Sequence, residues 1–136
     1  MGCCTYHGAG RVTYELILYD FSDARNPRSL QKLNCTFDRN VCVDGIVQLK
    51  FDKGIQVKPN VKYALTCYNS VNLTAYGQNG RHTILGPDGT KFQFSDHPTH
   101  SSGRTSIEMG QIPQILYGTE TSERHVSFFF YNVFLL

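Results

Sequence analysis

The densest group of chemically reactive side chains lies in one polar loop, where His97 and His100 are separated by Pro-Thr. Histidines are common zinc ligands, but a zinc site needs three or four ligands, and no carboxylate or thiol motif accompanies these two. Asp96, Ser101 and Ser102 flank the histidines, so the residue types of a hydrolytic triad are present. A triad also needs a nucleophile elbow and an oxyanion loop, and neither is recognisable. We therefore expect no catalytic residue, no metal and no cofactor in this chain.

Two further sequence features are of types that can bind anionic ligands. The segment 76–81 is rich in glycine, but it lacks the Gly-Lys-Ser/Thr of a phosphate-binding loop and no helix pattern follows it. We interpret this segment as a hairpin connection. Four lysines lie near aromatic residues, but side-chain alternation spreads them over different faces: Lys50, Lys53, Lys58 and Lys62. Because the formal net charge is only +2, the sequence predicts no nucleic-acid partner.

Length and composition limit the fold. The 136 residues, 40% hydrophobic and 12% aromatic, fit one folded domain and are too few for a barrel enzyme. The run 126–136 is the most apolar part of the chain, but it is shorter than the roughly 20 residues of a membrane helix, so we expect no membrane span. This run is interpreted either as a terminal core strand or as an artefactual or alternatively spliced tail.

The N-terminus and the cysteines predict a cytoplasmic protein. No charged segment followed by an apolar one marks a signal peptide. The Met-Gly-Cys start is typical of acylated proteins, but Tyr6 stands where myristoylation favours Ser or Thr, so residues 2–6 are interpreted as a half-buried strand. The odd cysteine count and the absence of Cys-x-x-Cys favour reduced thiols. The cysteines are Cys3, Cys4, Cys35, Cys42 and Cys67.

Apolar and polar side chains alternate with a period of two, which is typical of strands. In residues 12–20 this alternation places Val12, Tyr14, Leu16 and Leu18 on one face. Pro113 cannot donate to a β-ladder, so its strand should lie at an edge or carry a bulge. No capped helix is indicated, and the pattern predicts an all-β antiparallel sandwich. The predicted strands are residues 12–20, 33–37, 46–51, 55–57, 61–68, 82–85, 90–95 and 112–117.

Five short motifs follow one another in the order found in a known family. The most specific is Gly-Gln-Ile-Pro-Gln-Ile-Leu-Tyr at 110–117, and the others are at 2–8, 14–16, 60–63 and 88–94. In the first motif His7 replaces one glycine of the family pattern. Together the motifs resemble the PHR domain of the Pam and Highwire giant ubiquitin ligases and, more distantly, of BTB adaptor proteins. The matching positions include Gly2, Tyr6, Gly8, Asn60, Tyr63, Asp88, Gly89, Gly110, Gln111, Ile112, Pro113 and Tyr117.

The resemblance implies a jelly-roll-like antiparallel sandwich that binds proteins in the cytoplasm, within ligases that restrain synapse and axon growth. It also implies that the chain is not itself an enzyme, because a separate RING-type region of those ligases transfers ubiquitin. Family members begin one or two strands earlier, and residues 119–136 match nothing in the family. We therefore expect a PHR domain over residues 1–118 that lacks its opening strand, followed by a foreign tail.

Recognition on a β-scaffold is usually carried by loops, and two loops have suitable side chains. The predicted partner is a protein or a ubiquitination substrate, and the sequence sets no oligomeric state. The alternative function is a stand-alone ligand- or carbohydrate-binding domain, with a hydrolase third; the alternative for the loops is plain solvated turns. The candidate protein-binding residues are Tyr76, Asn79, Arg81, His97, His100 and Arg104.

Overall fold

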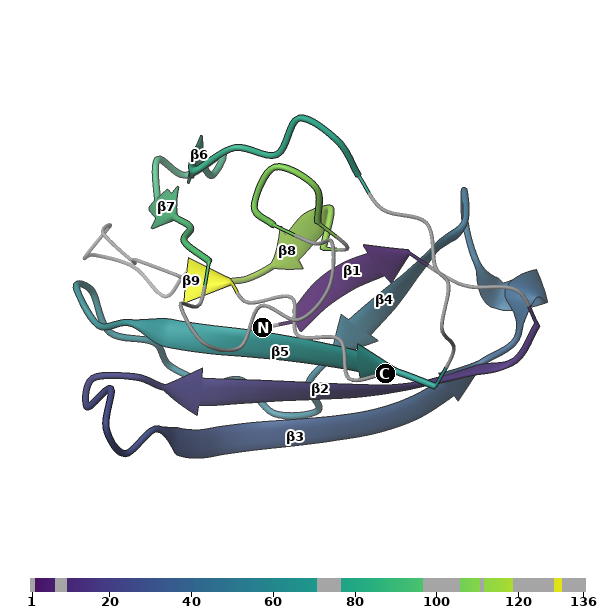
Figure 1. Cartoon of the computed structure of the whole chain (residues 1–136), viewed down its shortest axis with the longest axis horizontal. Helices are drawn as coiled ribbons and strands as arrows, with labels where there is room; N and C mark the ends of the chain where they lie inside the picture. The colour runs from purple at the N-terminus through teal and green to yellow at the C-terminus, as the bar shows by residue number, and fades with distance from the viewer. Residues whose placement is uncertain are drawn as a thin grey trace.

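The computed structural model describes residues 2–6, 10–70, 77–96, 106–110, 112–118 and 129–130. Within these residues the regular structure is β, apart from one short 3-10 turn, η1, at Arg39–Val41. The strands form three sheets in a sandwich-like arrangement, which confirms the predicted all-β class (Figure 1). The sheets are antiparallel except for one short parallel pair.

The largest sheet has the strand order β3-β2-β5-β9. The strands β2 (Val12–Asp20) and β3 (Arg28–Phe37) form a long hairpin with a register shift between Leu18 and Tyr19. The strand β5 (Tyr63–Asn69) lies antiparallel on the other side of β2. The short strand β9 (Phe129–Phe130) pairs in parallel with β5. The long strands run side by side in Figure 1.

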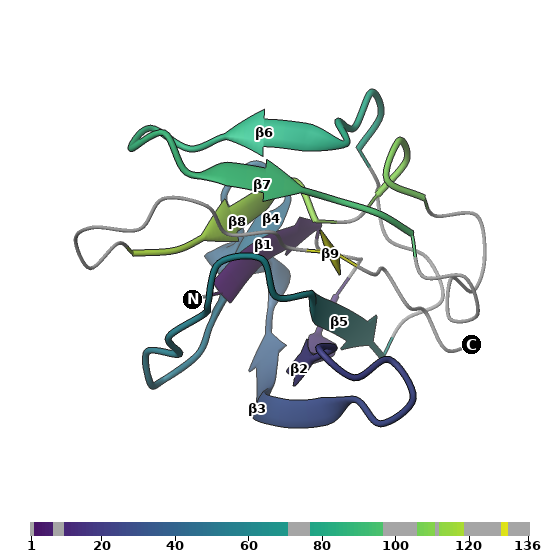
Figure 2. The same cartoon turned by 90° about the vertical axis from the view of Figure 1, so that its left-hand side faces the viewer.

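The second sheet has the order β4-β1-β8, with β1 (Gly2–Tyr6) between β4 (Ile46–Lys50) and β8 (Gln114–Leu116). The strands β6 (Thr83–Leu85) and β7 (Lys91–Gln93) form a separate hairpin. Figure 2 shows the three layers, with the β6–β7 hairpin above β8 and the long strands below β1 and β4.

The core lies between the layers and is built from the inward faces of the strands. Val12, Tyr14, Leu16 and Leu18 are all fully buried, as the alternation in β2 predicts. Tyr14 and Phe37 pack as a tilted ring pair with centroids 6.2 Å apart. The buried cluster consists of Val12, Tyr14, Leu16, Leu18, Val47, Leu49, Phe51, Tyr63, Leu65, Cys67 and Phe92.

Most predicted strands are confirmed, including residues 2–6, but two predictions are wrong. Residues 55–57 form no strand, although Ile55 and Val57 pack against the core as their alternation suggests. Segment 76–81 is not a hairpin connection, because within the described residues β5 pairs with β2 and β9 whereas β6 pairs with β7. Pro113 precedes β8, which is an edge strand of its sheet, as predicted.

Candidate functional site

A groove of about 390 Å³ lies at the end of the molecule that carries the β6–β7 hairpin. Among the described residues its walls come from four separated stretches: residues 77–81, the β6–β7 hairpin and the residues just after it, residues 106–110, and residues 112–115 at β8. Apolar side chains and a polar rim line it together, which is typical of recognition sites. The lining residues are Gly77, Gln78, Asn79, Gly80, Arg81, Ile84, Phe94, Asp96, Ser106, Ile107, Glu108, Gly110, Ile112, Pro113, Gln114 and Ile115.

Backbone hydrogen bonds join two walls of the groove. The N–H of Gly77 donates to the carbonyl oxygen of Gly110 at 2.8 Å, and the N–H of Gly80 donates to that of Glu108 at 3.0 Å. A Cβ on Gly80 would collide with the carbonyl oxygen of Ile107. Only glycine therefore allows these two segments to approach so closely.

A carboxylate at the end of the hairpin holds the 106–110 segment. The Oδ1 atom of Asp96 accepts a hydrogen bond from the N–H of Ile107 at 2.9 Å. Within the segment, the N–H of Ser106 donates to the carbonyl oxygen of Met109 at 3.0 Å, and the N–H of Met109 donates to the Ser106 hydroxyl at 3.2 Å. The loop is thus closed on itself and fixed to the strand pair.

The rim carries charged groups that are available to a ligand. Within the described residues the ion pairs are Arg28–Asp20 and Lys32–Glu15, so neither Arg81 nor Glu108 has an ion-pair partner there. With Asp96, the lining residues that the structure describes contribute two carboxylates and one guanidinium.

A polar latch fastens the hairpin to the residues that follow β8. The Tyr117 hydroxyl donates to Oδ1 of Asp88 at 2.7 Å, and Asp88 also accepts from the N–H and the hydroxyl of Thr90 at 3.1 and 2.7 Å. The Tyr117 ring packs edge-on against Phe92, with centroids 4.7 Å apart. A Cβ on Gly86 would collide with the Tyr117 hydroxyl, so a side chain at this position would displace the Tyr117 ring from Asp88.

The latch shifts the pKa of both partners. Hydrogen bonds from Thr90 and then from Tyr117 lower the pKa of Asp88 to about 2. Burial, followed by the bond to Asp88, raises the pKa of Tyr117 to about 12. Between these values the carboxylate accepts and the phenol donates, so the latch is intact near neutral pH.

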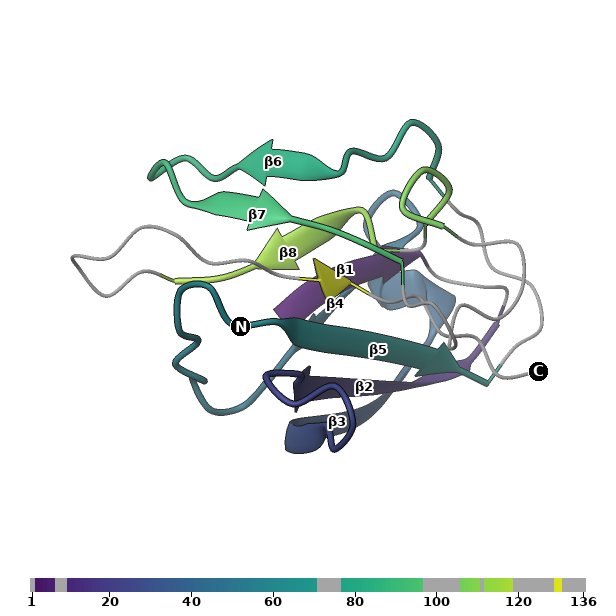
Figure 3. The ribbon, with the colours of Figure 1, turned by 60° about the vertical axis from the view of Figure 1, so that its left-hand side comes forward.

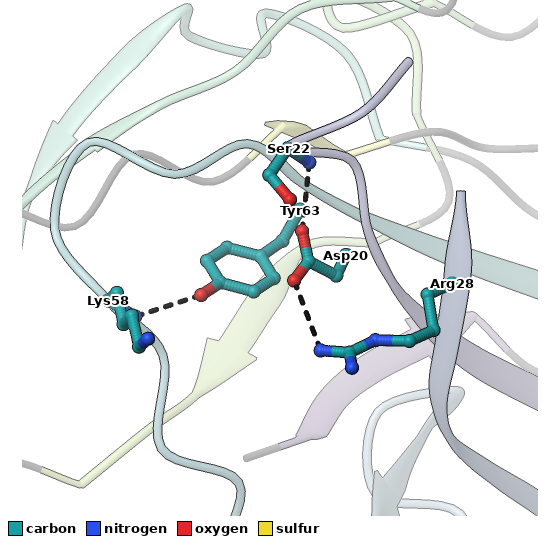
Figure 4. Close-up of polar contacts among 5 residues, drawn as sticks. All are labelled: Asp20, Ser22, Arg28, Lys58 and Tyr63. Carbon is teal, nitrogen blue, oxygen red and sulfur yellow. Dashed lines mark hydrogen bonds and ion pairs between the residues drawn. The ribbon is translucent and has the colours of Figure 1, made fainter. Parts of the chain in front are cut away.

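A second polar cluster lies where β2, β3 and β5 meet (Figure 4). Asp20 accepts from the N–H of Ser22 at 2.8 Å and lies 3.5 Å from the Arg28 guanidinium. Hydrogen bonds from Ser22, aided by the charges of Arg28 and Lys58, lower the pKa of Asp20. The Tyr63 hydroxyl accepts from the N–H of Lys58 at 2.9 Å. These contacts fix strand ends.

The structure brings two of the six predicted binding residues into the groove. Asn79 and Arg81 line it, and Asn79 has a φ of 60°, as its place before a glycine suggests. The other four, Tyr76, His97, His100 and Arg104, lie outside the described residues. Sequence reasoning missed Asp96 and Glu108 as groove residues.

Several motif positions that are far apart in the sequence lie together at the groove and the latch. Gly110, Ile112 and Pro113 line the groove, whereas Asp88 and Tyr117 form the latch. Gly2 and the backbone of Tyr6 lie in β1, while Asn60, with a φ of 60°, and Tyr63 lie at the start of β5. Gly89 closes the hairpin turn by donating to the carbonyl oxygen of Gly86 at 3.0 Å. Gly8 and Gln111 lie outside the described residues.

The described thiols are unpaired and not activated. Cys35, Cys42 and Cys67 are free, and burial raises the pKa of all three, that of Cys67 to about 12. A thiol needs a lowered pKa to act as a nucleophile near neutral pH, so these three are unsuited to that role.

The described part of the chain shows neither a metal-ligating cluster nor a membrane-spanning helix. No three residues of the metal-ligating types His, Cys, Asp and Glu gather there. No helix in the same part has the length and apolar character needed to cross a membrane.

The fold and the groove define an all-β domain of the sandwich type with a recognition-like groove beside a short hairpin. The sequence model of the PHR domain matches residues 1–118, and the chain belongs to the PHR domain family. It is 35% identical over 127 residues to E3 ubiquitin-protein ligase MYCBP2 of Danio rerio, a match that covers 86% of this chain. It is 30% identical over 121 residues to E3 ubiquitin-protein ligase highwire of Drosophila melanogaster, covering 85% of this chain. The chain spans only 3% and 2% of the lengths of these two relatives.

Proposed function

We propose that this chain is a protein-recognition domain of a Pam/Highwire-type E3 ubiquitin ligase, and that it recruits a partner or substrate without transferring ubiquitin itself. Family membership and similarity to two E3 ubiquitin-protein ligases support the ligase context. The proposal includes a cytoplasmic, synapse-associated site of action, which rests on the family resemblance.

The observation that carries the proposal is the groove. Its lining combines apolar side chains such as Ile84 and Phe94 with amide and charged groups such as Asn79 and Arg81. A mixture of apolar contact area and unpaired polar groups is what a protein surface needs to bind another protein selectively.

Competition with an intact ligase tests the recruiting role. The 136-residue chain, expressed in excess beside the full-length ligase, should lower ubiquitin conjugation on the ligase's substrates, measured by ubiquitin-remnant mass spectrometry. Arg81→Glu should abolish this competition, whereas Arg39→Glu, an exposed arginine outside the groove, should not. Equal effects of the two variants would overturn the assignment of the groove.

A smaller substitution tests the side-chain amide of Asn79. Asn79 and Asn60 both have φ near +60°, so glycine preserves the backbone at either position while removing the side chain. Asn79→Gly should weaken competition and Asn60→Gly should leave it unchanged.

The non-catalytic part of the proposal has its own test. The chain incubated with ubiquitin, ATP, an activating enzyme and a conjugating enzyme should yield no more ubiquitin conjugates than the mixture without it. Conjugates that depend on a cysteine of this chain would overturn this part.

A second candidate, a small-ligand or carbohydrate-binding domain, is favoured by one observation. Phe94, Asn79 and Asp96 all line the groove, and a ring beside amide and carboxylate groups suits a sugar. A glycan array decides between the two: selective binding to one sugar class, lost in Phe94→Ala, would support this candidate over protein recognition.

A further inference from the structure

The outer edge of β6 is set up to receive another strand. The N–H of Gly86 donates to the carbonyl oxygen of Thr90, and the N–H of Phe94 donates to that of His82, so the even-numbered residues direct their backbone groups toward β7. In an antiparallel pair the residues between these direct theirs outward. The N–H and C=O groups of Thr83 and Leu85 therefore face away from β7, and within the described residues β6 pairs with no other strand.

The position of β6 leaves this edge accessible. Figure 3 shows β6 at the outer margin of the molecule, with β7 between it and β8. All three residues of β6 are exposed, Leu85 to 69% and Ile84 to 47%. An exposed apolar edge strand is a site at which another chain can pair.

The two faces of β6 differ. Ile84 lies opposite the buried Phe92 in the ladder, so both side chains point to the same face, and Ile84 lines the groove. Leu85 is on the opposite face and does not line it. A strand added beside β6 would direct the residue next to Ile84, and the residues two positions away, toward the groove side.

The charges of the groove favour a basic side chain beside the apolar one. The hairpin pairing extends beyond β6 to His82 and Phe94, and Asp96 follows two residues later. Asp96 accepts from the N–H of Ile107, so Asp96 and the neighbouring Glu108 lie toward the His82 end of β6. Among the described lining residues, these two carboxylates outnumber the single guanidinium of Arg81.

We propose that β6 binds an extended segment of a partner protein by strand addition, with an apolar residue beside Ile84 and a Lys or Arg two positions along, toward His82. The inference rests on the proposed function and specifies the class of partner. Backbone hydrogen bonds to Thr83 and Leu85 supply affinity, while the groove and its carboxylates select the sequence.

Peptide selection tests the class of partner. The 136-residue chain is used to select from a phage-displayed library of random peptides about ten residues long, which suffices for one strand. Selected peptides should share an apolar residue and a basic residue at a spacing of two. Failure to enrich any sequence, or enrichment of acidic sequences, would overturn the inference.

A proline substitution in β6 tests whether its outer edge binds the peptide. Binding of a selected peptide labelled with fluorescein is measured by fluorescence anisotropy. Leu85→Pro removes one outward N–H and leaves the ladder to β7 intact, because proline is tolerated where the N–H faces away from the sheet. It should weaken binding by about fivefold to tenfold, the worth of one hydrogen bond, while Leu85→Ala should change it by less than about threefold. N-methylation of the peptide at the paired residue removes the same kind of bond without altering the protein, and should weaken binding similarly.

Face and charge are tested with the same peptide. Ile84→Asp should weaken binding by at least about tenfold, and Leu85→Asp, on the opposite face, should leave it nearly unchanged. Glu108→Gln should weaken binding of the basic peptide more than Asp52→Asn, an exposed acid outside the groove.

The outcomes separate this inference from the proposed function. Peptide binding that Ile84→Asp abolishes but Leu85→Pro and N-methylation leave unchanged would overturn strand addition and retain the groove. Dimers in sedimentation that Leu85→Pro dissociates would assign the edge to a second copy and overturn the peptide assignment. Loss of ligase competition in Arg81→Glu, with no peptide selected, would leave the proposed function standing alone.

Discussion

The sheet of β2, β3 and β5 and the end that carries β6, β7 and β8 are stabilised in different ways. The first has strands of seven to ten residues whose inward side chains fill the core. The second has strands of three residues, and only Phe92 among them belongs to the buried cluster. Loop-to-loop hydrogen bonds and the Asp88–Tyr117 latch add to its short ladders. Apolar burial tolerates small shifts of position, whereas hydrogen bonds and close backbone approach require particular residues. The sheet of long strands thus supports the end that carries the groove, where particular hydrogen bonds and glycines set the arrangement.

The largest expected loss of stability comes from a substitution in the core of the long-stranded sheet. Leu16→Ala removes a fully buried side chain of β2 and leaves a cavity, so it should lower the free energy of unfolding by about 2–5 kcal/mol, measured by urea denaturation. Leu85→Ala, with a side chain 69% exposed on β6, should change it by less than about 0.5 kcal/mol. Similar losses in the two variants would show that the exposed Leu85 side chain stabilises the fold as much as a core side chain does.

An intermediate effect is expected at the loop-to-loop contact. Gly80→Ala places a methyl group against the Ile107 carbonyl, so the two groove walls must separate, at a cost of about 1–3 kcal/mol. The matched control is Gly54→Ala, because Gly54 has open space around its Cα. Hydrogen exchange should show faster exchange at the amides of residues 77 and 80 in the first variant. Unchanged exchange there would contradict the proposed role of the contact.

The smallest effect on global stability is expected from the latch, and it should depend on pH. The pKa of Asp88 is lowered in the folded state to about 2, so its contribution is present above the ordinary value of 3.8 and is lost as pH falls through about 2. The pKa of Tyr117 is raised to about 12, so its contribution is present below the ordinary value of 10 and is lost as pH rises through about 12.

Asp88→Asn sharpens this test. It should return the Tyr117 pKa toward 10, and ultraviolet titration of the phenol measures this change. Comparison with Tyr117→Phe identifies which tyrosine signal belongs to Tyr117. In Tyr117→Phe the acid titration of the hairpin's amide signals should move to higher pH, because Asp88 loses a hydrogen bond that lowers its pKa. A Tyr117 titration unaltered by Asp88→Asn would show that the hydrogen bond does not set its pKa.

The alternation of apolar and polar side chains predicted which side chains are buried better than it predicted which segments pair as strands. It placed Val12, Tyr14, Leu16 and Leu18 on one face, and all four are buried. It also predicted a strand at residues 55–57, where Ile55 and Val57 pack against the core but lie outside any strand. A side chain can be buried without its backbone joining a ladder, so a period of two does not establish a strand. The reverse error occurs at β3, which begins at Arg28, well before the apolar positions of residues 33–37, because pairing with β2 extends it.

The sequence by itself determined the β class, the main core face and the turn glycines and asparagines, since these follow from local side-chain periodicity and backbone preference. Asn79 and Arg81 were recognisable as candidates because their loop combines polar groups with a turn signal. Only the tertiary structure placed them beside Asp96, Glu108 and the segment before β8, and only it directed β6 outward with Ile84 over the groove. These groups are brought together by contacts between segments far apart in the chain, and such contacts leave no spacing pattern in the sequence.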